Sequence, residues 1–150
     1  MGQSLTKVLV HLVFSTKDRK AYLDVRVRPE VHGYLIGALG NLDSPSLAVG
    51  GTADHIHCLC RLSKNLALAE LLMELKTSSS KWLHTKGSEY AGFHWQTGYG
   101  AFSVSESNAD AVIRYIQRQD EHHQRRTFKE ELLALLEKCQ VKYDERYLWD

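Results

Sequence analysis

The chain has 150 residues, of which 43% are hydrophobic and 25% are charged, and 19 basic against 18 acidic side chains give a net charge of +1. These values predict one globular domain over residues 1–150 and exclude a long disordered chain or a collagen-like repeat. No apolar run approaches the roughly 20 residues that cross a bilayer. The N-terminus does not resemble an export signal, and the three cysteines are an odd number. We therefore expect a cytoplasmic protein without a disulfide framework and without a membrane partner.

The near-neutral total conceals local clusters of basic residues. Five Lys and Arg residues fall within residues 17–28, and four Arg residues fall within residues 114–126. One interpretation is a locally basic surface on a neutral protein, and the other is scattered, solvated charge.

Hydrophobic periodicity predicts a strand, a helix and two further strands in the first half of the chain. Residues 8–14 alternate with apolar side chains on both faces, which is typical of a central strand. Pro29 suits the first turn of a helix, and Gly40 suits its end. Residues 46–49 and 54–62 are predicted as strands, with the glycine pair between them as a turn.

The second half of the chain is predicted to alternate helix, strand, helix and helix. Leucines at helical spacing predict a long helix over residues 68–87, and residues 99–104 are predicted as a strand. Ser107 is a suitable N-cap for a helix that runs to about residue 123. A capping box at residues 127–130 opens the last helix.

This order of elements predicts the fold class. Strand, helix, strand, strand, helix, strand is the split β-α-β order of a ferredoxin-like α+β sandwich. We expect an antiparallel or mixed sheet with helices on one face, followed by additional C-terminal helices.

The run His55-Ile56-His57 is the first candidate site. Residues two apart on a strand point the same way, so both imidazoles project from one face and can form half of a divalent-metal site. A purely structural histidine pair is the alternative. Cys58 and Cys60 fall on the opposite face with Ile56, so we interpret them as buried core thiols and not as zinc ligands.

The second candidate site is a polar stripe on the predicted helix that ends near residue 123. Tyr115, Arg118, Gln119 and His122 share one helical face, because residues three, four and seven positions apart do so. A tyrosine hydroxyl can act as a nucleophile, and a glutamine carbonyl is a hard ligand for magnesium or manganese. The alternative is a solvated helix face with a surface tyrosine.

The histidine pair and the Tyr-x-x-x-Gln motif together resemble the HUH endonucleases, named for His, a hydrophobic residue and His. Nearly the whole chain is similar to the single-tyrosine HUH transposases of small insertion sequences, the TnpA proteins of the IS200 group. The segments that carry this resemblance are HLVFSTKDRK (11–20), GGTADHIHCLCRL (50–62), WQTGYGAFSVSES (95–107), RYIQRQDEHH (114–123) and the C-terminal YDERYLWD (143–150).

The resemblance implies the chemistry and the residues that perform it. Tyr115 would be the nucleophile that forms a 5′-phosphotyrosine link and releases a 3′-hydroxyl. His55 and His57 would bind a divalent metal, with Gln119 as the third protein ligand. Mg²⁺ is the expected ion, and Mn²⁺ suits the imidazoles at least as well. No nucleotide cofactor is expected, because one phosphodiester is exchanged for another and the sequence has no phosphate-binding GxxxxGK[ST] loop.

The implied partners are single-stranded DNA with hairpins and a second copy of the chain. The resemblance implies a homodimer, and the sequence permits Tyr115 of one subunit to complete the histidine site of the other. A single strand is bound by a basic track with aromatic faces. The candidates for the basic side chains are Lys17, Arg19, Lys20, Lys76, Lys81 and Arg118.

Two alternative functions stay open at this point. A relative of the repeat-associated tyrosine transposases would process palindromes with the same chemistry but outside a mobile element. A non-catalytic ferredoxin-like module would bind hairpins without a metal. Asp120 competes with Gln119 for the third ligand position, although it lies about 100° further round the helix.

Overall fold

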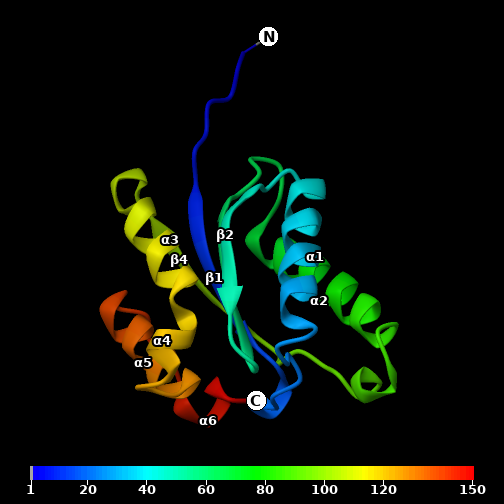
Figure 1. Cartoon of the computed structure of the whole chain (residues 1–150). Helices are drawn as coiled ribbons and strands as arrows, with labels where there is room; N and C mark the ends of the chain where they lie inside the picture. Colours follow the sequence, from blue (N-terminus) through cyan, green and yellow to red (C-terminus); the bar gives the residue numbers. More distant parts are fainter. Residues whose placement is uncertain (1) are drawn as a thin grey trace.

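The computed structural model describes residues 2–150, and its centre is a sheet of antiparallel strands in the order β2-β3-β1-β4 (Figure 1). The strands are β1 (Leu9–Ser15), β2 (Ser46–Gly51), β3 (His55–Arg61) and β4 (Gly100–Val104). The helices are α1 (Arg28–Asn41), α2 (Leu68–His84), α3 (Ala109–Gln117), α4 (Gln119–His123), α5 (Phe128–Lys138) and α6 (Glu145–Leu148). Three short 3-10 helices lie at Lys17–Arg19, Ser88–Tyr90 and Glu106–Asn108. The predicted α+β class and the split β-α-β order are confirmed.

The two central strands, β1 and β3, place three histidines on one face of the sheet. Every residue of β1 is buried, as its two apolar faces predict. β1 pairs with β3 in a register that puts His11 opposite Leu59 and Val13 opposite His57. Because side chains alternate along a strand, His11, Val13 and His57 all face the same side of the sheet.

Helices α1 and α2 cover one face of the sheet. Leu35 of α1 and Leu75 of α2 pack against β1 and β3 in the main hydrophobic core. Cys58 and Cys60 are buried in this core, and burial raises the pKa of Cys60 to about 12. The prediction that the cysteines are core thiols on the face opposite the histidines is confirmed.

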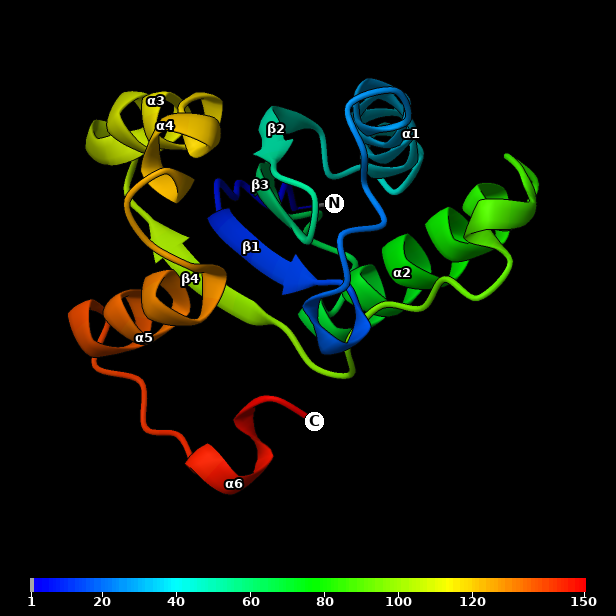
Figure 2. The same ribbon diagram turned by 60° about the horizontal axis from the view of Figure 1, so that its bottom comes forward.

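The C-terminal helices cover the other face, so the sheet is covered on both sides (Figure 2). Ala109 and Ile116 of α3 pack on Leu9 and Leu59. A separate hydrophobic cluster forms where α5 packs on β1 and β4, on the same face of the sheet. Its buried members are Val13, Phe102, Phe128, Leu132 and Leu136. The helices α3 to α5 therefore form a roof over the face from which His55 and His57 project.

The sequence-based boundaries are wrong at three points. The helix that carries Tyr115 does not run unbroken to His123: it breaks at Arg118, whose φ of −106° and ψ of 26° leave the helical region. Ser107 does not cap this helix, because Asn108 precedes its first residue and provides no side-chain cap. The glycine pair Gly50–Gly51 continues β2 and does not form a turn. The capping box of the last helix is confirmed.

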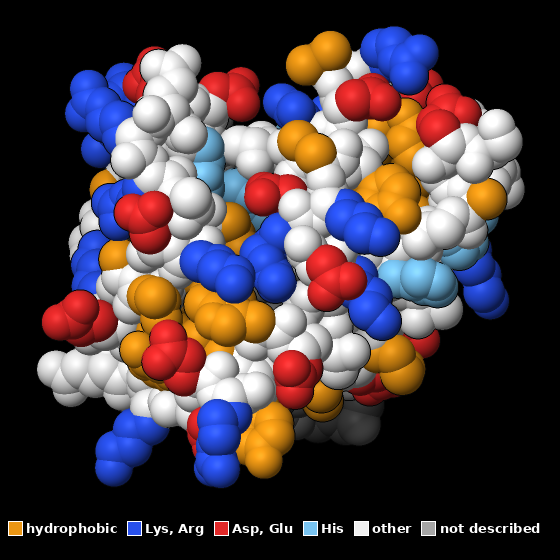
Figure 3. All heavy atoms as spheres, turned by 90° about the horizontal axis from the view of Figure 1, so that it is seen from below, with side chains coloured by type: hydrophobic (Ala, Val, Ile, Leu, Met, Phe, Trp, Pro, Cys, Tyr) orange, Lys and Arg blue, Asp and Glu red, His pale blue; other side chains and the backbone are white. Residues whose placement is uncertain are grey.

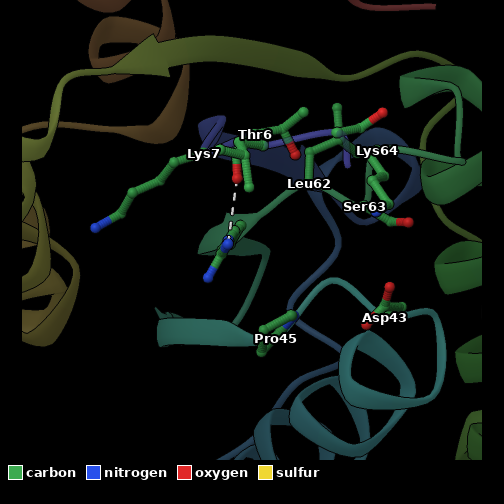
Figure 4. A pocket seen from close by; sticks show the side chains of 10 residues that line it. Thr6, Lys7, Asp43, Pro45, Leu62, Ser63 and Lys64 are labelled. Atoms are coloured by element: carbon green, nitrogen blue, oxygen red, sulfur yellow. Dashed lines mark hydrogen bonds between the residues drawn. The ribbon is translucent and has the colours of Figure 1, made fainter. Parts of the chain in front are cut away.

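At the end of β3 away from His55, a hollow of about 640 Å³ lies beneath the N-terminal segment (Figure 4). Arg61 Nη2 donates to the Thr6 carbonyl oxygen across it at 3.2 Å. Arg61 lies six positions after His55 along the strand, a span of about 20 Å, so this hollow is remote from the histidine pair. Within residues 2–150, no helix combines the length and the hydropathy that crossing a membrane requires.

Candidate active site

Strand β3 presents His55 and His57 to the roof helices, and both side chains are fully buried. Nε2 of His55 lies 2.9 Å from Oε1 of Gln119, which is the first residue of α4. Nε2 of His57 lies 2.9 Å from Oε1 of Glu131 on α5. The ligand atoms of His55, His57 and Glu131 all lie within 4.8 Å of one another. Two strand residues and two roof residues thus converge on one point.

The predicted nucleophile lies at the same point. The Tyr115 hydroxyl donates a hydrogen bond to Oε2 of Glu131, and Gln119 Nε2 donates to the same oxygen at 3.2 Å. The Tyr115 ring packs edge-on to His57, with 5.7 Å between ring centroids. The structure therefore brings together, within one chain, the predicted residues Tyr115, His55, His57 and Gln119.

Sequence reasoning missed Glu131, although it contacts every other member of the cluster. Its side chain is 1% exposed, and Oε1 also lies 3.1 Å from His123 Nε2. The signal was present in the amphipathic pattern of α5. Glu131 falls three residues after Phe128 and directly before Leu132, on the apolar side of the helix where an acidic residue is out of place.

The charges of the cluster compensate one another. Burial alone would raise the pKa of Glu131, but hydrogen bonds from His123, His55 and His57 outweigh burial and hold it well below its usual range. Burial alone would lower the pKa of His55, but bonds to Asp54, Glu131 and Gln119 raise it to about 9. The carboxylate is therefore ionised, and the charged His55 lies 3.4 Å from it.

The other two titratable members are held neutral. Burial lowers the pKa of His57 despite its contact with Glu131. Burial, together with the hydrogen bond to the Glu131 carboxylate, raises the pKa of the Tyr115 phenol well above its usual value. Tyr115 therefore holds its proton at neutral pH in this arrangement, pointed at Glu131.

Each histidine of the pair has a second partner on its far nitrogen. Nδ1 of His55 lies 2.7 Å from Oδ1 of Asp54 and 3.1 Å from Thr52 Oγ1. Nδ1 of His57 lies 2.8 Å from Nε2 of His11, a buried residue of β1. Burial lowers the pKa of His11 to about 3. Both imidazoles are thus oriented with Nε2 toward the cluster, as metal-binding histidines are oriented by outer partners.

The donor set fits a divalent cation. Two imidazole nitrogens, a carboxylate oxygen and an amide oxygen are aimed at one buried position, and both Nδ1 atoms are engaged elsewhere. Mixed nitrogen and oxygen donors suit Mn²⁺ well and Mg²⁺ adequately. Asp120, the competing ligand, lies outside the cluster: its side chain is 78% exposed and faces Arg28, with 3.6 Å between the charged atoms.

Aromatic side chains of the roof close the site. His123 and Phe128 pack over the His55 ring, with centroid separations of 4.4 and 4.7 Å. His122 packs on Tyr115 at 4.6 Å. Outside them, a recess of about 590 Å³ is lined by residues of the α4–α5 connection and by Arg28, Thr52 and Asp54. The cluster is thus one layer of side chains below this recess.

Two of the predicted basic residues, Arg19 and Lys76, meet at Gln96, and Arg19 Nη1 donates to the Gln96 side-chain oxygen at 3.4 Å. Lys76 Nζ donates to the backbone carbonyl oxygens of Gln96 and Gly98, and burial lowers its pKa to about 8. Arg19 lies over the Trp149 ring, with 5.6 Å from Cζ to the centroid. Lys17, Lys20, Lys81 and Arg118 are exposed. On the face shown in Figure 3, Lys and Arg side chains are interspersed with Asp and Glu.

Solved structures share this fold. A crystal structure of a candidate transposase from Deinococcus radiodurans R1 superposes with a TM-score of 0.62 at 22% identity, covering 79% of this chain and 96% of that one. A REP-associated tyrosine transposase bound to a REP hairpin superposes with a TM-score of 0.60 at 13% identity, covering 82% of this chain and 73% of that one.

Sequence comparison identifies the family. A search of curated proteins finds no significant match. The family described as "Transposase IS200 like" matches residues 4–119, a range that includes the histidine pair, the tyrosine and the glutamine. The cluster of a half-buried tyrosine, two buried histidines and a buried glutamine thus lies within the matched range, and the chain belongs to the IS200-like transposase family.

Proposed function

We propose that the chain cleaves and rejoins single-stranded DNA by using Tyr115 as the nucleophile at a divalent-metal site. The observation that carries the proposal is the convergence of the Tyr115 hydroxyl with the buried side chains of His55, His57 and Gln119. A solvated helix face would leave these polar groups apart and exposed. A hairpin-binding module without chemistry would have no need of this arrangement, whose burial is costly.

Each residue has a role in the proposed reaction. His55, His57, Gln119 and Glu131 would hold the cation, which supplies charge stabilisation to a non-bridging oxygen of the scissile phosphate. The Tyr115 oxygen attacks phosphorus and its proton passes to solvent or a neighbouring base. The bond from phosphorus to the 3′ oxygen breaks, and that oxygen takes up a proton from solvent and leaves as a 3′-hydroxyl. Attack by another 3′-hydroxyl on the phosphotyrosine link joins two strands and frees Tyr115.

We propose that the site is assembled within one chain. Tyr115 and His57 of the same chain are in ring contact, and both bond to one carboxylate. The homodimer implied by the family resemblance is then compatible with the chemistry but not required by it. Exchange of α3 alone between subunits would have to break the bond between Tyr115 and Glu131.

The proposed substrate is single-stranded DNA next to a hairpin. Membership of the IS200-like family supports DNA as the substrate. The solved REP-associated transposase is bound to a REP hairpin, and its fold likeness favours palindrome processing as a second candidate function. Flanking hairpins at both ends of a short mobile element would distinguish transposition from that second role.

The test is the formation of a covalent protein–DNA adduct. Labelled single strands carrying a hairpin and its flanks are incubated with the full chain and Mg²⁺ or Mn²⁺, then separated under denaturing conditions. We expect a metal-dependent adduct that the Tyr115→Phe variant does not form. An adduct formed by Tyr115→Phe, or the absence of any adduct from the wild type across hairpin sequences and both ions, contradicts the proposal.

A further inference from the structure

We propose that His11 is a positioning residue for the metal ligand His57: when a cation is bound, His11 Nε2 accepts a hydrogen bond from His57 Nδ1 and so directs Nε2 of His57 into the site. This inference rests on the function proposed above. His11 lies in the middle of β1, is 4% exposed and takes no part in the reaction steps.

The strand register creates the contact. Leu59 is the direct partner of His11 in the β1–β3 ladder, and Val13 is the direct partner of His57. The two histidines are therefore diagonal neighbours on one face, a relationship that long side chains can bridge. Nε2 of His11 lies 2.8 Å from Nδ1 of His57, and the rings stack at 29° with 5.0 Å between centroids.

The hydrogen bond selects one tautomer. An imidazole that offers the Nε2 lone pair to a cation carries its proton on Nδ1. While His57 donates its Nε2–H to Glu131, its Nδ1 accepts from His11 Nε2–H. When Nε2 binds a cation, the His57 proton lies on Nδ1 instead, and His11, with its own proton on Nδ1, offers Nε2 as the acceptor. An outer hydrogen bond of this kind fixes both the ring orientation and the tautomer of a metal ligand.

His55 is also oriented by an outer hydrogen bond at its Nδ1, but its acceptor is a carboxylate. Its Nδ1 meets the carboxylate of Asp54, whose side chain is 29% exposed and reaches water. Position 11 lies under the roof, where a carboxylate would be a second buried negative charge beside Glu131. A neutral imidazole provides the acceptor without that charge, which would be costly to bury.

The test measures metal binding in the absence of DNA. Mn²⁺ affinity is determined by electron paramagnetic resonance titration of the full chain and of three variants. His11→Phe fills the space but accepts no hydrogen bond, and we expect it to weaken Mn²⁺ binding by about 10- to 100-fold. His11→Gln keeps a carbonyl acceptor and should retain most of the affinity. His84→Phe is the matched control, since His84 is the last residue of α2, which covers the opposite face of the sheet, and bonds the Phe93 carbonyl oxygen there.

A second measurement uses the wild type alone, so it does not depend on a variant's folding. Long-range ¹H–¹⁵N spectra with Mg²⁺ should show His57 protonated on Nδ1. A His57 protonated on Nε2, or a folded His11→Phe with wild-type Mn²⁺ affinity, overturns the role of His11 and leaves the proposed function standing. A wild type that binds no Mn²⁺ overturns both.

Discussion

The carboxylate of Glu131 lies 2.9 Å from Nε2 of His57, although 74 residues separate them in the sequence. Its other oxygen accepts the hydroxyl of Tyr115 and the amide of Gln119. One buried carboxylate therefore contacts both the histidine pair and the nucleophile. A cation bound at the cluster would compete with the histidines for Glu131, so ion binding and the placement of Tyr115 are linked through this side chain.

Glu131→Gln tests that link. The substitution keeps the shape of the side chain but removes the charge that His55 balances. We expect Mn²⁺ binding to weaken by about 10-fold or more, and the metal-free protein to lose about 3 kcal/mol of unfolding free energy, because a buried counter-charge is lost. Calorimetric titration and urea unfolding measure the two effects. Glu137→Gln, on the exposed side of the same helix, should change neither. Unchanged Mn²⁺ affinity in folded Glu131→Gln would remove Glu131 from the ligand set.

Alanine substitutions along β3 test the two faces of the strand separately. His55→Ala or His57→Ala should lower metal-dependent cleavage by about 100-fold or more, since metal stabilisation of the transition state is worth several kcal/mol. Cys58→Ala should leave cleavage intact and cost about 1–2 kcal/mol of stability, because it opens a small cavity in the opposite core. Gel-based cleavage assays and thermal unfolding separate these outcomes. Loss of metal binding in a folded Cys58→Ala protein would contradict the face assignment.

The pKa of His55 predicts a pH dependence of stability in the metal-free protein. The pKa of about 9 in the folded state is above the ordinary histidine pKa of 6.5. The contribution of charged His55 to the free energy of unfolding is complete below pH 6.5. It is lost as the pH rises toward 9, because in this range the folded state binds more protons than the unfolded state. Relative to His55→Gln, the wild type should lose about 1 kcal/mol between pH 7 and pH 8. Urea unfolding in the presence of a chelator measures the difference. A difference that grows with pH would contradict the charged state assigned to His55.

Mixing two inactive variants tests whether one chain builds the whole site. Tyr115→Phe lacks the nucleophile and His57→Ala lacks a ligand. If Tyr115 acts beside its own His57, the mixture forms no more adduct than either variant alone. If subunits exchanged the tyrosine, random pairing into dimers would restore roughly a quarter of the sites. Adduct yield at matched protein concentration decides between these arrangements, and recovery in the mixture would refute assembly within one chain.

The sequence predicted those parts of the site that depend on local periodicity. Alternation along β3 placed His55 and His57 together, and helical spacing placed Tyr115 near Gln119. Glu131 could not be placed in this way, because its contact with Tyr115 depends on how the chain turns between α4 and α5. His11 could not be placed either, because its neighbour is set by the register between two strands.

The helix break at Arg118 shows the limit of helical periodicity. No Pro or Gly marks it in RYIQRQDEHH, so spacing alone predicted one continuous polar stripe. In the structure Arg118 is exposed and Gln119 is buried, although both belong to the predicted stripe. The hydrogen bond between Gln119 and His55 is a long-range contact, and tertiary contacts of this kind override local helical preference.

The break also sharpens the choice between Gln119 and Asp120 as the metal ligand supplied by α4. Gln119 is 2% exposed and directs Oε1 at His55, whereas Asp120 faces Arg28 at the surface. A carboxylate is the harder ligand, so ligand chemistry alone favours Asp120. The burial of Gln119 and the orientation of its Oε1 toward His55 favour Gln119. We expect Gln119→Ala to raise the Mn²⁺ concentration needed for half-maximal cleavage by about 10-fold, and Asp120→Ala to leave it unchanged. A metal titration of adduct formation measures both, with Gln117→Ala as a control for a neighbouring exposed amide. The opposite pattern would require α4 to rotate when the cation binds, which would break the contact between Gln119 and His55 and bring Asp120 into the roof.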